Sequence, residues 1–395
     1  ASKLRLLSAN AIVLDAGEHT VVTAQQQYGV PILSLTDPDG RDIVERAARN
    51  VSIVAVARGR HVLQVAANKM SAPPGRYELT VDRPRPADAR DIARASGDRF
   101  LSEAQSLMSQ RSASANQEAI DKLTSALARF GQAEYRWGEA LVAMRLGQAY
   151  VSSPNQMEKA RDYLTQAVAL ARAIEDTSLE ALSLFYLGNT YPALAERKRA
   201  LEYYEQALTQ FEVNGDLVNQ SLGLTHQETA RSDLQEHQTA VEDYNRALSL
   251  ARSVDDRAQV ARIHNGLGIT YQDLGDVPMA LEHFSQALPL SRSTGNLQLE
   301  YMVINNAGIA YKQLGDYRRA LDSYQQSLVL VKKLGNRSNE AQLLNNIGNI
   351  YRAEGQSELS VASYEQALSM FRLLKAQAGE AMALNNMGAA YYQLG

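Results

Sequence analysis

The sequence repeats itself every forty residues, and this period constrains the fold more than any other feature. Glycines and tyrosines recur in step, and alanines and aromatic residues recur at the same interval, twelve and sixteen positions after the glycine position. The residues in step are Gly188, Gly268, Gly308, Gly348 and Gly388; Tyr191, Tyr271, Tyr311, Tyr351 and Tyr391; Ala200, Ala240, Ala280 and Ala320; and Tyr204, Tyr244, Phe284, Tyr324 and Tyr364. A period of this length indicates an array of one supersecondary unit, which buries its core by stacking.

Composition excludes several classes of function. Of the 395 residues, 45% are hydrophobic and 21% are charged, as in an ordinary folded protein. The net charge of −4 comes without a long run of one sign, which argues against general nucleic-acid binding. No apolar run reaches the roughly 18 residues of a membrane span, so we expect no membrane insertion. Cysteine is absent, which excludes disulfides, thiolate metal sites and cysteine nucleophiles within these residues.

The first 82 residues lack the repeat and carry short β-rich runs instead. Turn signals such as Asp37-Pro38-Asp39-Gly40 separate these runs. The expected strands cover 11–14, 19–24, 31–35, 51–57, 61–67 and 76–81. Short strands at this spacing predict a small antiparallel β-sandwich of the jelly-roll kind over 1–82. The Pro-containing, polar segment 83–91 is expected to be the linker to the repeats.

The order of features in residues 1–82 resembles the bacterial pre-peptidase C-terminal (PPC) domain. The resemblance rests on Ala16-Gly17-Glu18, on LSLTDPDGRDI at 33–43 and on GRYELTV at 75–81. Such domains are accessory modules of exported bacterial proteins, and no catalytic residue carries over. The resemblance therefore implies a bacterial protein and favours export, with a cytoplasmic location left open.

From residue 92 onward the apolar pattern is helical. The expected first pairs are 92–111 with 115–131 and 136–151 with 155–173, and regular pairs begin near 178, 218, 258, 298 and 338. A lone helix from about 378 ends at Gly395, so the sequence predicts about seven helix pairs and a truncated half repeat. We therefore expect the natural protein to continue past Gly395. The repeat at 218–253 departs from the pattern, with Glu228 in place of glycine and Arg231 in place of tyrosine, and any kink is expected there.

The repeat resembles the tetratricopeptide repeat (TPR). Its signature is a glycine, a tyrosine three residues later, a turn glycine and then Ala-Leu-x-x-Tyr, as at Gly308, Tyr311, Gly315 and 320–324. The resemblance spans 92–395 and is most specific in 258–395. It implies an all-α superhelical solenoid whose inner groove is lined by the first helix of each pair. The expected fold class is therefore α+β and multidomain, a β-sandwich followed by this solenoid.

Three consecutive Asn-Asn pairs mark the candidate binding site. In similar repeat proteins, asparagines at these positions hydrogen-bond the backbone of an extended peptide, since an amide both donates and accepts. The predicted groove residues are Asn306, Asn346 and Asn386, with Asn349 and Asn189 in a second position and Asn305, Asn345 and Asn385 in an adjacent column that begins at Asn265. The alternative is that these amides cap or bridge neighbouring helices. The Asn265 column in particular could face the neighbouring repeat.

Other kinds of site are less favoured. A carboxylate clamp of the chaperone-binding kind needs basic residues beside the asparagines, and in the corresponding positions only Arg262 is basic. The six histidines show no metal-ligand spacing, and no nucleotide-binding or hydrolase motif stands in a suitable context. We therefore expect no catalytic residue, no cofactor and no metal site within these residues.

Three functions remain open from the sequence. The first is a scaffold that binds a protein or peptide ligand in the solenoid groove. The second follows from the order of the modules, which resembles the front end of bacterial proteins that end in a CHAT domain, a caspase-like peptidase. This resemblance implies that the chain is the sensor or regulatory part of a larger protein. The third is a structural module that self-associates through the exposed half repeat.

Overall fold

The computed structural model describes the chain from residue 11 to residue 394 with interruptions. The described ranges are 11–14, 16–26, 32–36, 42–47, 50–54, 59–66, 77–81, 85–110, 112–153, 156–191, 196–232 and 237–394, and for most strand residues they cover the backbone only. Eight strands precede fifteen helices in these ranges. The strands are β1 (Ala11–Leu14), β2 (Glu18–Gln26), β3 (Ile32–Thr36), β4 (Asp42–Ala47), β5 (Asn50–Val54), β6 (Gly59–Ala66), β7 (Tyr77–Val81) and β8 (Arg85–Pro86).

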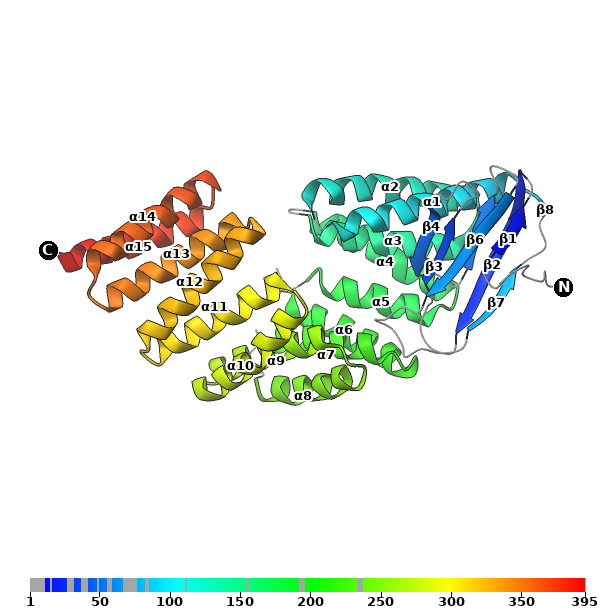
Figure 1. The fold of residues 1–395 in the computed structure, drawn as a ribbon. Coiled ribbons are helices and arrows are strands. Elements are labelled where there is room, and N and C mark those ends of the chain that lie inside the picture. The colour runs from blue at the N-terminus through cyan, green and yellow to red at the C-terminus, as the bar shows by residue number, and fades with distance from the viewer. Residues whose placement is uncertain are drawn as a thin grey trace. The chain divides into compact units, whose positions relative to one another are not determined.

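The strands form two antiparallel sheets. One has the order β1-β6-β3-β4, and the other has the order β5-β2-β7 with β8 also paired to β2 (Figure 1). The six predicted strand runs all coincide with strands, but β4 and β8 were not predicted. The Asp37–Gly40 turn lies outside the described residues. How the sheets pack depends on side chains that are also outside them, so the jelly-roll sandwich stays a prediction.

The predicted linker 83–91 needs correction, because this segment contains regular structure. It includes β8 and the first turn of helix α1 (Ala89–Ser109). Asp88 caps this helix by accepting a hydrogen bond from the Asp91 backbone N–H, and the Asp91 carboxylate accepts one in return from the Asp88 N–H. The Arg85 guanidinium donates two hydrogen bonds to Asp91, and Nδ1 of the buried His19 lies 3.3 Å from it. These contacts join β2 and β8 to the start of α1.

The chain divides into two compact units, 1–230 and 231–395. This division differs from the predicted boundary at 82–91, because α1 contacts β4 and β5 and so joins the sheets to the first helices. The boundary falls within the irregular repeat, where Arg231 pairs with Asp243 and the fully buried Glu228 replaces the glycine. The kink expected there stays a prediction.

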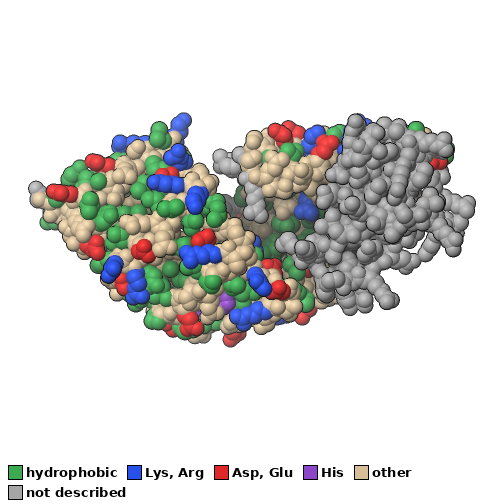
Figure 2. Space-filling view, viewed as in Figure 1, with side chains coloured by type: hydrophobic (Ala, Val, Ile, Leu, Met, Phe, Trp, Pro, Cys, Tyr) green, Lys and Arg blue, Asp and Glu red, His purple; other side chains and the backbone are tan. Residues whose placement is uncertain are grey.

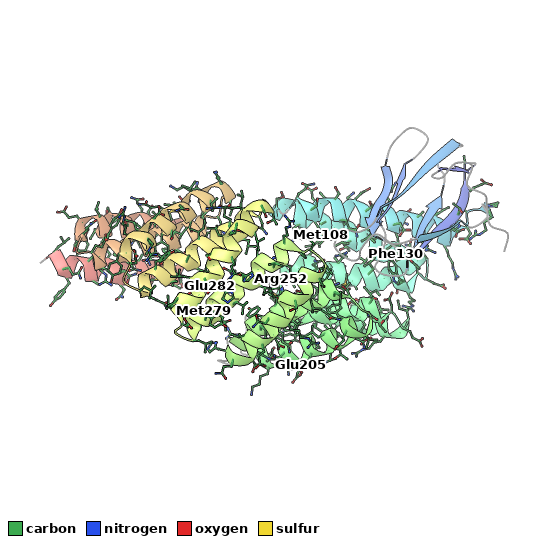
Figure 3. All side chains as sticks on the ribbon, turned by 60° about the horizontal axis from the view of Figure 1, so that its bottom comes forward. Met108, Phe130, Glu205, Arg252, Met279 and Glu282 are labelled. Atoms are coloured by element: carbon green, nitrogen blue, oxygen red, sulfur yellow. The ribbon has the colours of Figure 1, made fainter. Side chains whose placement is uncertain are left out.

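The helices of the first unit run in antiparallel pairs. They are α1, α2 (Ala113–Gln132), α3 (Arg136–Val151), α4 (Met157–Ala173), α5 (Thr177–Gly188), α6 (Arg197–Val213) and most of α7 (Leu217–Ser232). One hydrophobic core runs through α1–α6 and includes the fully buried Phe130, with Met108 packed at its edge (Figure 3). Phe130 lies against the backbone at Gly97 and Gly138: an added Cβ would lie 2.6 Å from its ring at Gly97 and 2.7 Å from its ring at Gly138.

The second unit contains the most regular repeats. Its helices are α8 (His237–Ser253), α9 (Arg257–Asp273), α10 (Val277–Ser293), α11 (Leu297–Gln313), α12 (Tyr317–Leu334), α13 (Arg337–Ala353), α14 (Ser357–Leu373) and α15 (Gln377–Leu394). The first helices α9, α11, α13 and α15 each begin one residue before the predicted position. The predicted turn chemistry is also confirmed, since Gly275 and Gly315 have φ of 85° and 75° and the following aspartates cap α10 and α12.

The glycine and aromatic positions of the repeat meet inside each pair. A Cβ at Gly348 would lie 2.6 Å from the Tyr364 ring, and a Cβ at Gly268 would lie 2.4 Å from the Phe284 ring. The rings are almost completely buried, and each also packs in a cluster with residues of the next first helix. Glycine therefore lets the two helices approach until an aromatic ring covers the backbone.

A second repeated contact joins one pair to the next. An arginine near the end of a second helix pairs with a glutamate eight residues later, in the first turn of the following helix. The pairs are Arg172–Glu180 at 2.7 Å, Arg292–Glu300 at 2.8 Å and Arg372–Glu380 at 2.8 Å, with Lys332–Glu340 at 3.9 Å in the same position. The glutamates also suit the positive end of the helix dipole. This contact, which we call the Arg–Glu clasp, fixes the turn between pairs.

Candidate functional site

The candidate site lies on the first helices of the second unit, α9, α11, α13 and α15. Within this unit α9 contacts α11 and α13 contacts α15, whereas no contact of similar extent joins α10 with α12 or α12 with α14. The first helices thus lie closer together than the second helices in the pairs α9–α11 and α13–α15, which places these first helices on the inner side of the array there. The predicted asparagines, except Asn189 in the first unit, are on these helices.

Side-chain amides bridge successive first helices at two places. Asn306 Nδ2 on α11 donates to Asn265 Oδ1 on α9, and Asn386 Nδ2 on α15 donates to Asn345 Oδ1 on α13, both at 3.0 Å. Asn265 and Asn345 are only 5% and 2% exposed. The column that begins at Asn265 thus faces the neighbouring helix on α9 and α13, as one of the sequence alternatives held. We call Asn265, Asn306, Asn345 and Asn386 the amide ladder.

Among the described residues, no side-chain amide bridge of this kind joins α11 and α13. Asn305 Nδ2 lies 3.5 Å from Asn306 Oδ1, at the long limit of a hydrogen bond. The half-buried Asn346 amide makes no hydrogen bond within the part of the chain that the structure describes. Asn385, the last member of the adjacent column, is exposed. Among the described residues, the Asn346 amide therefore keeps all of its donors and acceptors for another molecule.

Asn349 and Asn189 have a second kind of partner. Asn349 Oδ1 accepts a hydrogen bond of 2.8 Å from the Tyr364 hydroxyl, and Asn189 Oδ1 accepts one of 2.7 Å from the Tyr204 hydroxyl. Burial raises the pKa of Tyr204, so this hydroxyl stays a neutral donor. These two asparagines satisfy buried hydroxyl groups of their own repeats, which is a structural role that the sequence analysis did not assign to them.

Apolar side chains surround the amides on the same helices. Met302 on α11 and Met382 on α15 are 38% and 41% exposed, and Ile269 on α9 is 36% exposed. Arg262, the one basic residue in the clamp position, donates to Gln259 at 3.1 Å. The surface thus combines amides with flexible apolar side chains, which can contact an extended chain without demanding one sequence. Figure 2 shows acidic and basic side chains interspersed on the face it draws, among the residues that it colours.

A pair of histidines is buried beside this surface. Nδ1 of His264 on α9 lies 3.1 Å from Nδ1 of His283 on α10, and the Tyr271 ring stacks on His283 with centroids 5.2 Å apart. Burial, followed by the charges of His283 and Arg252, lowers the pKa of His264 to about 4. The charge of Arg252 lowers the pKa of His264, whereas the charge of Glu282 raises the pKa of His283 against the effect of burial. Arg252 and Glu282 are both labelled in Figure 3. His264 and His283 are thus partners of each other within the α9–α10 pair.

The described side chains contain no cluster of three or more His, Asp or Glu placed to hold a metal ion. None of the helices in the described ranges is long and apolar enough to cross a membrane. The sequence analysis missed the bridging partners of Asn306 and Asn386. In the sequence, these bridges correspond to an interval of forty-one residues between the donor and the acceptor asparagine, one residue more than the repeat length.

The repeats match a known family. Residues 220–293 and 300–373 match the tetratricopeptide repeat family. The sequence matches no curated protein.

Solved structures share the fold at low sequence identity. Aspartyl phosphate phosphatase F from Bacillus subtilis matches with a TM-score of 0.57 and 12% identity, over 72% of this chain and 72% of that chain. A tetratricopeptide repeat protein from Parabacteroides merdae matches with a TM-score of 0.50 and 15% identity, over 73% and 99% of the two chains. BtubC from P. vanneervenii matches with a TM-score of 0.50 and 19% identity, over 55% and 92%. The chain therefore carries tetratricopeptide repeats within residues 220–373, in helix pairs whose fold these structures share.

Proposed function

We propose that the chain is a protein-binding scaffold that holds an extended peptide on the first helices of its second unit. The observation that carries the proposal is the free amide of Asn346 between two bridged amide pairs, Asn306–Asn265 and Asn386–Asn345. Bridging fixes the orientation of two amides, and each bridging Nδ2 uses one of its two hydrogens. Donors at successive helices can therefore meet successive parts of one peptide backbone.

The neighbouring apolar groups support the same ligand. Met302 and Met382 lie one turn before the amides on their helices and are more than a third exposed. Thioether side chains adapt to different apolar partners. A peptide with polar backbone contacts to the amides and apolar side chains toward the methionines would satisfy both kinds of group. The large inner surfaces of repeat arrays suit extended ligands in general.

The test selects peptides and then removes the amides. Random twelve-residue peptides displayed on phage are selected on the full chain, and their affinities are measured by fluorescence anisotropy. We expect Asn346→Ala to weaken binding at least tenfold with an unchanged thermal midpoint, because its amide has no protein partner to lose. The triple variant of Asn306, Asn346 and Asn386 to alanine should bind still more weakly.

Asn189→Ala is the matched control, since Asn189 belongs to the first unit and its carbonyl serves Tyr204. This variant should lose stability and keep peptide affinity. Peptides that bind the folded triple variant as tightly as the original chain would show that the ligand does not use this surface.

The regulatory role in a larger bacterial protein is a separate proposal that rests on the order of the modules. All six predicted strand runs coincide with strands, which supports a PPC-like domain ahead of the repeats. Sequencing the source gene beyond codon 395 tests it. An in-frame CHAT domain with a histidine and cysteine pair would support the role of sensor, and an early stop codon would contradict it.

A further inference from the structure

Helix α3 of the first unit carries an arginine at the repeat position of the predicted groove asparagines. Arg145 precedes Gly147 by two residues, as Asn306 precedes Gly308. Packing supports this alignment, because a Cβ at Gly147 would lie 2.3 Å from the Leu164 side chain on α4, the second helix of the pair. Arg145 is half-buried at this position. The position that carries an amide in the second unit thus carries a positive charge on α3.

Two hydrogen bonds in series connect Arg145 with the next first helix, α5. Arg145 Nη1 donates to Gln148 Oε1 at 2.9 Å, and Gln148 Nε2 donates to the Tyr186 hydroxyl at 3.1 Å. Tyr186 stands at the same repeat position on α5, two residues before Gly188, and its ring packs against Phe185 with centroids 5.3 Å apart. Gln148 therefore holds one side of the guanidinium next to a packed ring. We call Arg145, Gln148 and Tyr186 the Arg145 site.

The guanidinium of this site has donors left over. Among the described residues, Arg145 makes one hydrogen bond, to Gln148, and has no carboxylate partner. Its Nε atom is buried and has no hydrogen-bond partner. Because Nη1 is used, the remaining donors include Nε and Nη2, whose N–H groups lie on one edge of the guanidinium and point in parallel. Such an edge matches the two oxygens of a carboxylate.

Other arginines of the first unit do have a counter-charge. Arg136, Arg161, Arg172 and Arg199 each have a glutamate oxygen within 2.7 to 3.6 Å. Removing a guanidinium from water without such a partner costs stability. Side chains that break a local rule at a cost to stability concentrate at functional sites. A ligand is therefore the expected source of the negative charge that Arg145 lacks.

We propose that the Arg145 site binds a carboxylate of a ligand on the Nε–Nη2 edge of the guanidinium. The site supplies one positive charge, which a carboxylate neutralises, whereas a doubly charged phosphate would retain an excess negative charge. The carboxylate belongs to an acidic side chain of a polypeptide or to a small free acid, and the test below distinguishes the two. The site lies in the first unit, and its occupation does not depend on the amide ladder or on the peptide proposed above.

The test follows the Nε–H signal of Arg145 in NMR spectra of the full chain. The probes are a blocked tripeptide with a central glutamate, the same tripeptide with glutamine, sodium acetate and sodium phosphate. We expect a saturable shift with the glutamate peptide and none with the glutamine peptide, because only the carboxylate neutralises the guanidinium. Binding of the glutamate peptide at least tenfold more tightly than acetate would identify a polypeptide side chain as the source, and equal affinities would identify a small acid.

Arg145→Met removes the donors and should abolish binding of the glutamate peptide, followed in this variant through the side-chain amide signal of Gln148. The thermal midpoint should stay unchanged or rise, because methionine replaces a half-buried charge that has no counter-charge. A lower midpoint would show that the arginine is already satisfied in the free protein and would overturn the proposal.

Arg129→Met is the matched control. Arg129 on α2 also donates to a glutamine three residues later, Gln132, at 3.0 Å, but this arginine is exposed. The variant removes the same charge from the same unit, and we expect less than a twofold change in affinity. Equal losses in the two variants would assign the binding to net charge and overturn the proposal. The absence of a saturable shift with either carboxylate, or tighter binding of phosphate, would also overturn it.

Discussion

The helix pairs α11–α12 and α13–α14 place the same tyrosine over the same glycine, but the two hydroxyl groups have different surroundings. The Tyr364 hydroxyl donates to Asn349, whereas the Tyr324 hydroxyl is buried without a hydrogen-bond partner among the described residues. The position of Asn349 is taken by Ile309 in the first of these pairs. In α9–α10, Ile269 occurs with Phe284, which has no hydroxyl to satisfy. The repeat thus specifies how the ring packs, whereas the hydrogen-bond partner of the ring's hydroxyl group differs from one helix pair to the next.

The packing shared by the two pairs is the feature most sensitive to change. Gly348→Ala would place a Cβ 2.6 Å from the Tyr364 ring, and Gly308→Ala would place one 2.8 Å from the Tyr324 ring. We expect Gly348→Ala to lower the free energy of unfolding by about 2 to 3 kcal/mol, and Gly308→Ala by less. Gly388→Ala, with open space around it, should instead stabilise the helix by up to about 1 kcal/mol. Denaturant melts measure the free energy of unfolding of the three variants. Equal changes in all three would contradict the role of the glycines in packing against the rings.

The pair α9–α10 extends the comparison to pH. It has His264 and His283 where the other two pairs have Ile304 with Ser323 and Leu344 with Ser363. The unfolded chain binds a proton at His264 near pH 6.5, but burial lowers the folded-state pKa to about 4. The unfolded state therefore binds more protons between these values, and stability falls as the pH is lowered from 6.5 to 4.

We expect this histidine to account for a loss on the order of 2 kcal/mol over that window. Hydrogen exchange at pH 6.5 and pH 4.5 should show the loss in α9 and α10 more than in α13 and α14. The variant with His264→Leu and His283→Ser, which copies the α13–α14 pair, should lose this difference between the pairs. Equal pH dependence of the variant and the original chain would assign the effect to other groups.

Replacing each of the two tyrosines by phenylalanine is expected to change the stability of the chain in opposite directions. Tyr324→Phe removes a buried hydroxyl that has no partner and should stabilise the chain by about 1 kcal/mol. Tyr364→Phe removes a satisfied hydroxyl and should destabilise it by about 1 kcal/mol. Thermal melts measure both changes. Ile309→Asn, which supplies the missing acceptor, should remove the benefit of Tyr324→Phe, and destabilisation by both phenylalanines would show that Tyr324 has a partner.

The smallest predicted effect concerns the turns that follow α12 and α14. Gly335 has φ of 66° in the first turn, and Lys375 has φ of 55° at the same position of the second. A left-handed conformation costs a residue with a Cβ about 1 kcal/mol or more. Lys375→Gly should therefore stabilise the chain by about 0.5 kcal/mol after the entropy of glycine is counted. Gly335→Ala is the reverse change, and it should lower the midpoint of unfolding.

The regular helices could be predicted from the sequence because the period marks each start and the turn chemistry marks each end. The strand β4 could not, because its sequence DIVERA has three charged residues and no clear alternation, and its place is set by pairing with β3. The helix start at Ala89 was missed because Asp88 and Asp91 were read as linker polarity, when they form a capping box.

The candidate site was predictable only in part. The sequence located the asparagines on the first helices, but the partner of each amide depends on the distance between helices, which the pattern does not give. Asn306 and Asn346 have the same position in the repeat, yet one is bridged and the other is free. The Tyr324 hydroxyl likewise has no partner among the described residues because Ile309 stands at the repeat position of Asn349, and the periodicity of the sequence does not predict this difference.

The Arg–Glu clasp has a consequence for how such a chain can change in length. Because the basic residue and the glutamate are eight residues apart at each turn that carries the clasp, removing residues 297–336 would place Glu340 eight residues after Arg292 and rebuild the same ion pair. The same excision would place Asn346 where Asn306 now donates to Asn265. A whole pair can therefore be lost or duplicated in the gene without creating a new kind of junction, so array length can evolve separately from the chemistry that joins its members.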